Sequence, residues 1–295
     1  MIAALIQSLR PKQWTKNLLL LAGVLFSRQI GEPALVLRAA AGFFAFSLLS
    51  GAVYLLNDVS DVEEDRRHPV KRARPVASGR LPARVALLAH APVLAAVVAL
   101  AYGLGRGFSL VGGIYLVVNL AYTFFLKKQV LIDVFVIAGG FVLRAVAGVE
   151  LLLPVSPGTK LSPWLLMCTF FGALFIALGK RARELANAGE EAPTKRAVLA
   201  HYTPALVDGL LLIAAGSSVM SYSLYTIWPD TVAKFGTERL LWTVPLVAYG
   251  IFRYLYLVWA ARSSEDPAQV LLTDRPLAAC VLLYLGAVLL ILYRA

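Results

Sequence analysis

Three aspartates and an asparagine stand close together directly after the second long apolar run of the chain. Along a helix, which turns by about 100° per residue, these four side chains fall on one stripe. Carboxylates that share a stripe at a membrane boundary repel one another, and a bound cation relieves the repulsion. Carboxylate and amide oxygens suit Mg²⁺, which in proteins commonly bridges to substrate phosphates. The sequence therefore predicts a magnesium site, with the aspartates as its catalytic residues, formed by Asn57, Asp58, Asp61 and Asp65. A solvated acidic loop, balanced by its basic neighbours, is the alternative.

A basic run follows these acids directly. Five Arg or Lys side chains occur within the ten residues 66–75. Guanidinium and ammonium groups bind phosphate oxygens, so metal-binding carboxylates beside such cations predict a diphosphate substrate. Arg66 and Arg74 are the candidate substrate contacts in this run. The alternative is that these charges only set the membrane topology.

The composition indicates that the elements which position these residues cross a membrane. The chain has 295 residues, of which 59% are hydrophobic and 15% are charged, whereas a soluble domain has about 25% charged residues. The formal net charge is +11. Because the basic residues cluster between apolar runs, we expect them to meet membrane lipid or phosphates, and we expect no nucleic-acid partner. Cys168 and Cys280 lie within apolar runs without metal-like spacing, which is typical of ordinary buried thiols.

Nine apolar runs approach the length of about 20 residues that a membrane-spanning helix needs. With the N-terminus inside, the inner segments carry 19 Lys and Arg residues and the outer segments carry 7. This asymmetry favours a cytoplasmic N-terminus and a cytoplasmic site. We predict an all-α, polytopic protein of the inner (plasma) membrane, with a single catalytic domain (1–295), cytoplasmic loops near 57–82 and 181–204, and a tight hairpin at 127–129. The predicted spans are 15–31, 34–56, 83–104, 108–126, 130–152, 162–180, 205–228, 238–261 and 276–293.

Lys16 and Arg144 are two further candidate substrate contacts. Lys16 stands at the first entry into the membrane, where a lysine can also act as a snorkelling anchor. Arg144 lies well inside the fifth span, where an ionised side chain is costly and usually faces a cavity or a partner. The alternative for Arg144 is a structural ion pair with an acid such as Asp133.

The acidic run, read as N-D-x-x-D-x-x-x-D, together with Arg74-Pro75 and about nine spans, resembles the UbiA superfamily of intramembrane prenyltransferases. The resemblance covers nearly the whole chain. It implies a ring of nine helices around a central cavity, with cytoplasmic caps over the polar end, and Mg²⁺ and a diphosphate on the four residues named above. It also implies a tyrosine followed by basic residues at the end of the fourth span, for which Tyr122 and Lys127 are the candidates. An interfacial aromatic and a topology anchor are the alternatives for these two.

Members of that superfamily carry a second acidic motif, D-x-x-x-D, in the loop after the sixth span. Here the corresponding segment, 179–185, has three cations and one carboxylate, namely Lys180, Arg181, Arg183 and Glu184. This exchange argues against a second Mg²⁺ and for a directly bound phosphate at Lys180 and Arg181.

The exchange is similar to one branch of the superfamily, the decaprenyl-phosphate phosphoribosyltransferases. The same branch is resembled by the segments Leu9–Asn17, Leu131–Val134, Phe141–Arg144, Glu265–Pro267 and Thr273–Pro276. The resemblance implies transfer of 5-phosphoribose from phosphoribosyl pyrophosphate to a polyprenyl (decaprenyl) phosphate, with release of pyrophosphate, in the synthesis of cell-wall arabinan precursors. Lys180, Arg181 or the cluster Arg66–Arg74 would hold the 5-phosphate. A homo-oligomer is compatible with this interpretation.

Two other functions remain open at this point. The first is prenyl transfer from a prenyl diphosphate to an aromatic ring, which the missing second acidic motif disfavours. The second is an anion or lipid transporter, suggested by the intramembrane Arg144 and Arg253. Against transport, the sequence has no inverted repeat, and the acidic stripe lies at a membrane edge rather than at the midplane.

Overall fold

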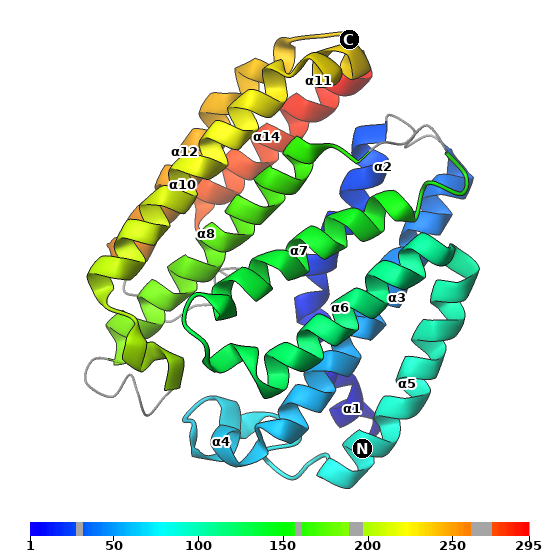
Figure 1. The fold of residues 1–295 in the computed structure, drawn as a ribbon, viewed down its shortest axis with the longest axis vertical. Coiled ribbons are helices and arrows are strands. Elements are labelled where there is room, and N and C mark those ends of the chain that lie inside the picture. The colour runs from blue at the N-terminus through cyan, green and yellow to red at the C-terminus, as the bar shows by residue number, and fades with distance from the viewer. Residues whose placement is uncertain (28–31, 157–160, 189–196, 261–272, 295) are drawn as a thin grey trace. The chain divides into compact units, whose positions relative to one another are not determined.

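The computed structural model describes residues 1–27, 32–156, 161–188, 197–260 and 273–294, and every regular element in these ranges is a helix (Figure 1). Eight of the helices are long and apolar enough to cross a membrane. The prediction of an all-α, polytopic integral membrane protein is therefore confirmed. The spanning elements are α3 (Pro33–Ser60), α5 (Ala83–Leu104), α6 (Arg106–Phe124), α7 (Ile132–Glu150), α8 (Pro163–Ala188), α10 (Pro204–Ile227), η6 (Arg239–Thr243) with α12 (Val244–Trp259), and α14 (Arg275–Arg294).

The first predicted span, 15–31, differs from the other eight. After the short α1 (Ile2–Ser8), the chain forms the 3₁₀-helix η1 (Pro11–Leu21) and then α2 (Ala22–Ser27). Glycines bring this segment close to α7. A Cβ at Gly148 would lie 2.3 Å from the Leu20 carbonyl oxygen, and one at Gly23 would lie 2.8 Å from the Gly148 carbonyl oxygen. The narrower winding of a 3₁₀-helix suits so close a backbone approach.

Some sequence predictions fall outside the described residues. These are the ends of the spans 15–31 and 238–261, part of the loop 181–204, the segment Glu265–Pro267, and Arg28, Lys160, Lys195, Arg196 and Arg262 in the topology count. The sixth span was predicted too short, because α8 continues to Ala188. Residues 181–188 are thus helical, and the basic segment that follows Gly179 lies on a helix rather than in a loop. The turn predicted at 127–129 is present but longer, because residues 125–131 connect α6 to α7 and include the short η3 (Leu126–Lys128).

The described residues form two compact units. The first comprises residues 1–127 and 139–161 and the second residues 128–138 and 162–295, so the chain changes unit three times, once within α7. The single catalytic domain and the central cavity stay predictions.

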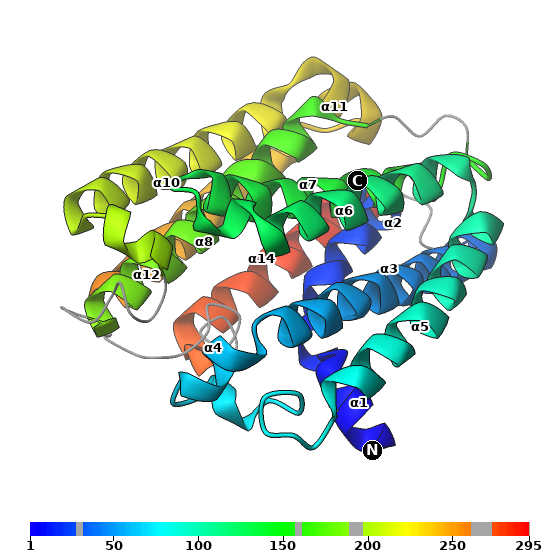
Figure 2. The same ribbon diagram turned by 60° about the horizontal axis from the view of Figure 1, so that its bottom comes forward.

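The first unit is built around α3, which packs against α5, α6 and η1. Its core is apolar and includes Leu20, Phe46, Leu49, Phe108 and Leu151. Arg38 of α3 fastens one end of this unit, donating hydrogen bonds to the Leu104 carbonyl at the end of α5 and to the Leu151 carbonyl just past α7. Helix ends leave such carbonyls without helical partners, and a cation there satisfies them. The opposite end of this unit holds both α1 and α4 (Val62–Arg67) (Figures 1 and 2).

The second unit is a bundle in which α8 packs extensively against α10, and α12 against α14. Phe175 and Leu178 of α8 and Leu211 of α10 are fully buried in it. The short α11 (Pro229–Phe235) follows α10 at one end, and η5 (Ala197–His201) precedes α10 at the other (Figure 1).

Candidate active site

The acidic stripe is formed where α3 passes into α4. Asp61 stands at the junction, with φ −99° and ψ 12°, and bends the chain without breaking the helical hydrogen-bond ladder. The Asp61 amide still donates to the Asn57 carbonyl at 2.9 Å, and the Asp65 amide donates to the Asp61 carbonyl at 2.8 Å. Residues four apart therefore stay on one face, and the Asn57 Nδ2 donates to Asp61 Oδ2 at 3.1 Å. The predicted stripe is present.

Two of the acids, Asp58 and Asp65, are buried and share one guanidinium. Arg74 Nη1 lies 2.6 Å from Asp65 Oδ2 and 3.3 Å from Asp58 Oδ1. Both carboxylate side chains are only 2% exposed. Arg74, predicted as a substrate contact, thus lies directly in the acidic cluster.

Arg10 is a second cation on Asp58. Its guanidinium makes a salt bridge to Asp58 Oδ1 and lies over the Tyr54 ring, with Cζ 4.7 Å from the ring centroid. The Arg10 backbone is left-handed, with φ 53°, a conformation that is uncommon for any residue other than glycine. Arg10 was not singled out from the sequence. Its signals there were its position before Pro11 at the first membrane entry and its place in the segment Leu9–Asn17, which resembles the phosphoribosyltransferase branch.

The third acid, Asp61, accepts a hydrogen bond from Lys127 at the turn between α6 and α7. The Asp61 side chain is 19% exposed and the Lys127 side chain 17%. Lys71 adds a looser pair to Asp65 at 3.9 Å. The predicted contact residue Lys127 is therefore brought to the stripe from a distant part of the sequence.

The acidic stripe does not need a bound metal ion to relieve the repulsion among its carboxylates. The repulsion among the three aspartates is relieved by the chain's own cations, Arg10, Arg74 and Lys127. In the ranges that the structure describes, no three Asp, Glu, His or Cys side chains converge as a metal site. The donor chemistry nevertheless fits Mg²⁺, because the carboxylate and amide oxygens are hard ligands. The cations that now bind these oxygens are of the kind that binds phosphate.

Three other residues were predicted as substrate contacts, namely Arg66, Lys16 and Tyr122. Arg66 pairs with Glu63 at 2.6 Å, and its Nε donates to the Ala77 carbonyl at 3.3 Å, with about half of the Arg66 side chain exposed. Lys16 is half-buried in η1, and Tyr122 is half-buried near the end of α6.

Arg144 is buried in the first unit and fully engaged by protein groups. Its Nε donates to Asn17 Oδ1 at 2.7 Å, its Nη1 to the Gly140 carbonyl at 2.8 Å and its Nη2 to the Tyr115 hydroxyl at 2.9 Å. Asn17 in turn donates to the hydroxyls of Ser47 and Ser50. The guanidinium also lies over aromatic rings, among them that of Phe46. This placement favours a structural role over substrate contact.

A second buried polar network surrounds Asp133 in the second unit. Arg181 Nε lies 2.9 Å from Asp133 Oδ2, and Arg181 Nη1 makes a salt bridge to Glu184. Asp133 therefore pairs with Arg181, so the alternative that paired Asp133 with Arg144 is wrong. Arg181 is 1% exposed, and its charge is balanced within the protein. Its neighbour Lys180 is exposed on the same helix, and is the better placed of the two for a phosphate.

Tyr202 closes this network from the segment before α10. Its hydroxyl donates to Asp133 Oδ1 at 2.7 Å and accepts from the Leu131 amide at 2.9 Å. Leu131 has a left-handed backbone, with φ 66°, which this hydrogen bond helps to hold. Burial and the hydrogen bond to Asp133 raise the pKa of Tyr202 above its usual range. The sequence carried no signal for Tyr202, because an aromatic residue in a polar loop has many uses.

Known proteins resemble this chain over nearly its full length. The decaprenyl-phosphate phosphoribosyltransferase of Mycolicibacterium smegmatis is 31% identical, over 98% of this chain and 92% of that protein. The decaprenyl-phosphate phosphoribosyltransferase of Corynebacterium glutamicum is 34% identical, over 98% of this chain and 86% of that protein.

Solved structures share the fold at lower sequence identity. A UbiA homologue from Archaeoglobus fulgidus, bound to GPP and Mg²⁺, superposes with a TM-score of 0.73 at 19% identity, over 98% of this chain and 99% of that one. The model of the UbiA prenyltransferase family matches residues 18–273, which is most of the sequence and includes the whole acidic stripe. The chain is therefore a member of the UbiA prenyltransferase family.

Proposed function

We propose that this protein transfers 5-phosphoribose from phosphoribosyl pyrophosphate to a polyprenyl phosphate and releases pyrophosphate. The observation that carries the proposal is the interleaved cluster of acids and cations at the end of α3, in which Asp58, Asp61 and Asp65 each hold a basic side chain. Such a cluster offers ligands both to a metal and to a diphosphate. The relatives named as decaprenyl-phosphate phosphoribosyltransferases support this substrate pair.

The diphosphate of the donor would bind at this cluster. Asn57, Asp58, Asp61 and Asp65 would hold Mg²⁺, which when bound supplies positive charge to the departing pyrophosphate. Arg10, Arg74 and Lys127 would then exchange their carboxylate partners for phosphate oxygens. Because each of these cations already has an anionic partner in the protein, none has to be stored as a bare buried charge before the substrate arrives.

The bond changes need little from the protein beyond alignment. The bond between C1 of the ribose and the diphosphate oxygen breaks, and a bond from C1 to an oxygen of the lipid phosphate forms. The lipid phosphate is already an anion, so no strong general base is required. Charge stabilisation of the leaving group and orientation of the two reactants can supply most of the acceleration.

The 5-phosphate of the donor needs a separate cation. Lys180 is our candidate, since its side chain is exposed, whereas that of its neighbour Arg181 is 1% exposed. In this proposal Arg181 acts as a positioning residue that fixes the end of α8.

We further propose that the N-terminus and the acidic cluster face the cytoplasm of a plasma membrane. The excess of Lys and Arg on that side supports this orientation. The position of α1 and α4 at the same end of the first unit is consistent with it (Figure 2).

The decisive experiment uses the purified full-length protein in detergent with radiolabelled phosphoribosyl pyrophosphate, decaprenyl phosphate and Mg²⁺. We expect label in the lipid fraction and stoichiometric pyrophosphate, both abolished by a chelator and restored by Mg²⁺. Transfer of a prenyl group from a prenyl diphosphate to an aromatic acid, with no labelled lipid, would instead establish the aromatic prenyltransferase alternative. Turnover in detergent, where no sealed compartment exists, excludes transport as the whole function.

A further inference from the structure

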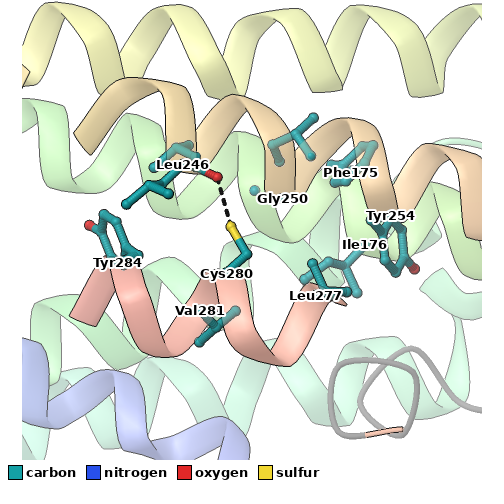
Figure 3. A pocket seen from close by; sticks show the side chains of 12 residues that line it. Phe175, Ile176, Leu246, Gly250, Tyr254, Leu277, Cys280, Val281 and Tyr284 are labelled. Atoms are coloured by element: carbon teal, nitrogen blue, oxygen red, sulfur yellow. Dashed lines mark hydrogen bonds between the residues drawn. The ribbon is translucent and has the colours of Figure 1, made fainter. Parts of the chain in front are cut away.

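An apolar pocket in the second unit has no part in the reaction as described so far. It has a volume of about 240 Å³ and is lined by α8, α12 and α14 (Figure 3). The lining is almost entirely hydrocarbon, from residues such as Phe175, Ile176, Leu246, Leu277 and Val281.

Two glycines leave this space open. A Cβ at Gly172 of α8 would meet nothing within 4 Å. A Cβ at Gly250 of α12 would meet only ordinary contacts, 3.9 Å to Cys280 Sγ and 3.9 Å to Leu277 Cδ1. Close-packed interiors seldom leave such room among three helices. A Cβ at either of these two lining glycines would therefore fit without displacing backbone atoms.

A charged side chain, Arg183, lies beside Tyr254 at one end of the pocket, although it is not part of the pocket lining. Tyr254 lies at this end with Ile176 and Leu277, and Tyr284 lies at the opposite end (Figure 3). The Arg183 guanidinium lies over the Tyr254 ring, with Cζ 5.5 Å from the centroid, and Arg183 is only 6% exposed.

A third glycine, Gly179, makes this arrangement fit. A Cβ at Gly179 would lie 2.8 Å from Tyr254 Cε1, so only glycine lets the ring pack closely against α8. Arg183 then follows one turn later, over the same ring.

The end of the pocket beside Arg183 lies at helix termini, because α8 and α12 end there and α14 begins there. Arg183 is in the last turns of α8, which ends at Ala188, and Tyr254 is in the last turns of α12, which ends at Trp259. Leu277 is in the first turn of α14, which begins at Arg275. From this end the apolar lining runs inward along the helices. A molecule that matches the pocket has an anionic head at the helix termini and a hydrocarbon tail toward the middle of the spans.

We infer that this pocket binds the polyprenyl monophosphate acceptor, with its first isoprenoid carbons in the apolar part and its phosphate at Arg183. The inference rests on the proposed function, whose second substrate it places. A volume of about 240 Å³ lies below the roughly 300–1,000 Å³ of pockets for drug-sized ligands. It therefore suits a segment of one chain rather than the paired chains of a bilayer phospholipid.

The test compares a filled pocket with a matched control. Gly172→Leu fills the pocket, whereas Gly286→Leu adds the same side chain on α14 where nothing lies within 4 Å. We expect Gly172→Leu to raise the KM for decaprenyl phosphate about tenfold or more, with the KM for phosphoribosyl pyrophosphate unchanged. Gly286→Leu should change neither. Gly250→Val is the second filling variant if Gly172→Leu does not fold.

The charged end is tested with Arg183→Gln and Arg183→Lys. We expect Arg183→Gln to raise the KM for decaprenyl phosphate about tenfold or more, because a charge-assisted contact to the phosphate is lost. Arg183→Lys should recover part of the affinity. Neither variant should alter the KM for phosphoribosyl pyrophosphate. A general loss of structure would change this KM as well, so an unchanged value excludes that explanation.

Native mass spectrometry of each variant with decaprenyl phosphate, without the sugar donor, separates this inference from the proposed function. The lipid site is supported if the wild-type protein binds the lipid and Gly172→Leu and Arg183→Gln do not. If the same wild-type protein transfers no phosphoribose, the proposed function is refuted while the lipid site stands. Normal lipid binding in the folded filling variants and in Arg183→Gln would overturn the inference. Equal competition by phosphatidylglycerol would overturn it too.

Discussion

Among the three aspartates where α3 passes into α4, Asp61 is the one for which an effect on catalysis can best be separated from an effect on folding. Its side chain is 19% exposed, whereas those of Asp58 and Asp65 are 2% exposed. We expect Asp61→Asn to lower kcat by about 100-fold or more, because a charged ligand is lost where the leaving group's charge develops. The melting temperature should change little. Turnover of phosphoribosyl pyrophosphate and thermal unfolding are the two measurements.

The control for this variant is Glu64→Gln. Glu64 is exposed on α4 and lies at the edge of the stripe. The Glu64→Gln substitution removes one negative charge from the same segment and should leave kcat within about twofold of the wild-type value. If Asp61→Asn turns over at a near-normal rate, Asp61 is not a ligand of the metal.

Arg144 should prove to be a structural residue. Arg144→Leu would remove the guanidinium from Asn17 Oδ1 and from the Tyr115 hydroxyl, both of which are buried. A buried polar group left unsatisfied costs about 1–3 kcal/mol, so the melting temperature should fall markedly. The melting temperature of Tyr115→Phe, which removes a single hydrogen bond, should fall less. Both variants should keep the wild-type KM for each substrate, measured below their melting temperatures, and a selective rise in one KM would show that Arg144 contacts that substrate.

At the scale of the element, the contact of η1 with α7 depends on a single missing side chain. Gly148→Ala would place a Cβ 2.3 Å from the Leu20 carbonyl oxygen. Backbone cannot yield as a flexible side chain does, so we expect a loss of about 1–3 kcal/mol in the free energy of unfolding. Gly139→Ala, on the same helix with nothing within 4 Å, should be neutral or stabilising by about 0.5–1 kcal/mol. Equal melting temperatures of the two variants would contradict this close approach.

The network of Tyr202, Asp133 and Arg181, which joins the starts of α7 and α10 to the end of α8, should be sensitive to alkaline pH. Burial and the hydrogen bond to Asp133 raise the pKa of Tyr202 on folding. A raised pKa means that the folded state keeps its proton after the unfolded chain has lost it, near pH 10. The resulting stabilisation is fully present below about pH 10 and is lost as the pH rises toward the folded pKa.

Tyr202→Phe tests this behaviour. At neutral pH the variant should be less stable by about 1–3 kcal/mol, because the Leu131 amide and Asp133 each lose a partner. Between about pH 9 and pH 11, its melting temperature should fall less steeply than that of the wild type. Parallel curves for the two proteins would mean that the pKa of Tyr202 is not raised on folding.

Features that depend on local sequence could be predicted, whereas features that depend on tertiary packing could not. The helices α5, α10 and α14 were predicted to within one or two residues, because their apolar runs end in Pro, Gly or charged residues. The acidic stripe was predictable because it needs only helical periodicity. The partners of its members were not, since Arg10 and Lys127 are distant in sequence and reach the stripe through tertiary packing. The prediction that Arg181 binds a phosphate did not foresee its burial for the same reason. Arg181 is buried through its contact with Asp133, which lies 48 residues earlier.

At the scale of the whole molecule, the orientation in the membrane stays a prediction from charge. It can be tested with Ser78→Cys, in the exposed segment after α4, and Glu238→Cys, between α11 and η6. In right-side-out vesicles a membrane-impermeant maleimide should label Glu238→Cys and spare Ser78→Cys. Inverted vesicles should show the reverse. The native cysteines lie in the spanning helices α8 and α14, and labelling of Ser78→Cys from outside would reverse the topology.

The winding of η1 lengthens the N-terminal segment for its number of residues. A 3₁₀-helix rises about 2.0 Å per residue and an α-helix about 1.5 Å. The 11 residues of η1 and the 6 of α2 therefore extend about 31 Å, which is about 5 Å more than the same residues would reach if they were wound wholly as an α-helix. The tighter coil thus lets a segment of few residues reach far along the first unit and still keep the slender profile that the contact between Leu20 and Gly148 requires.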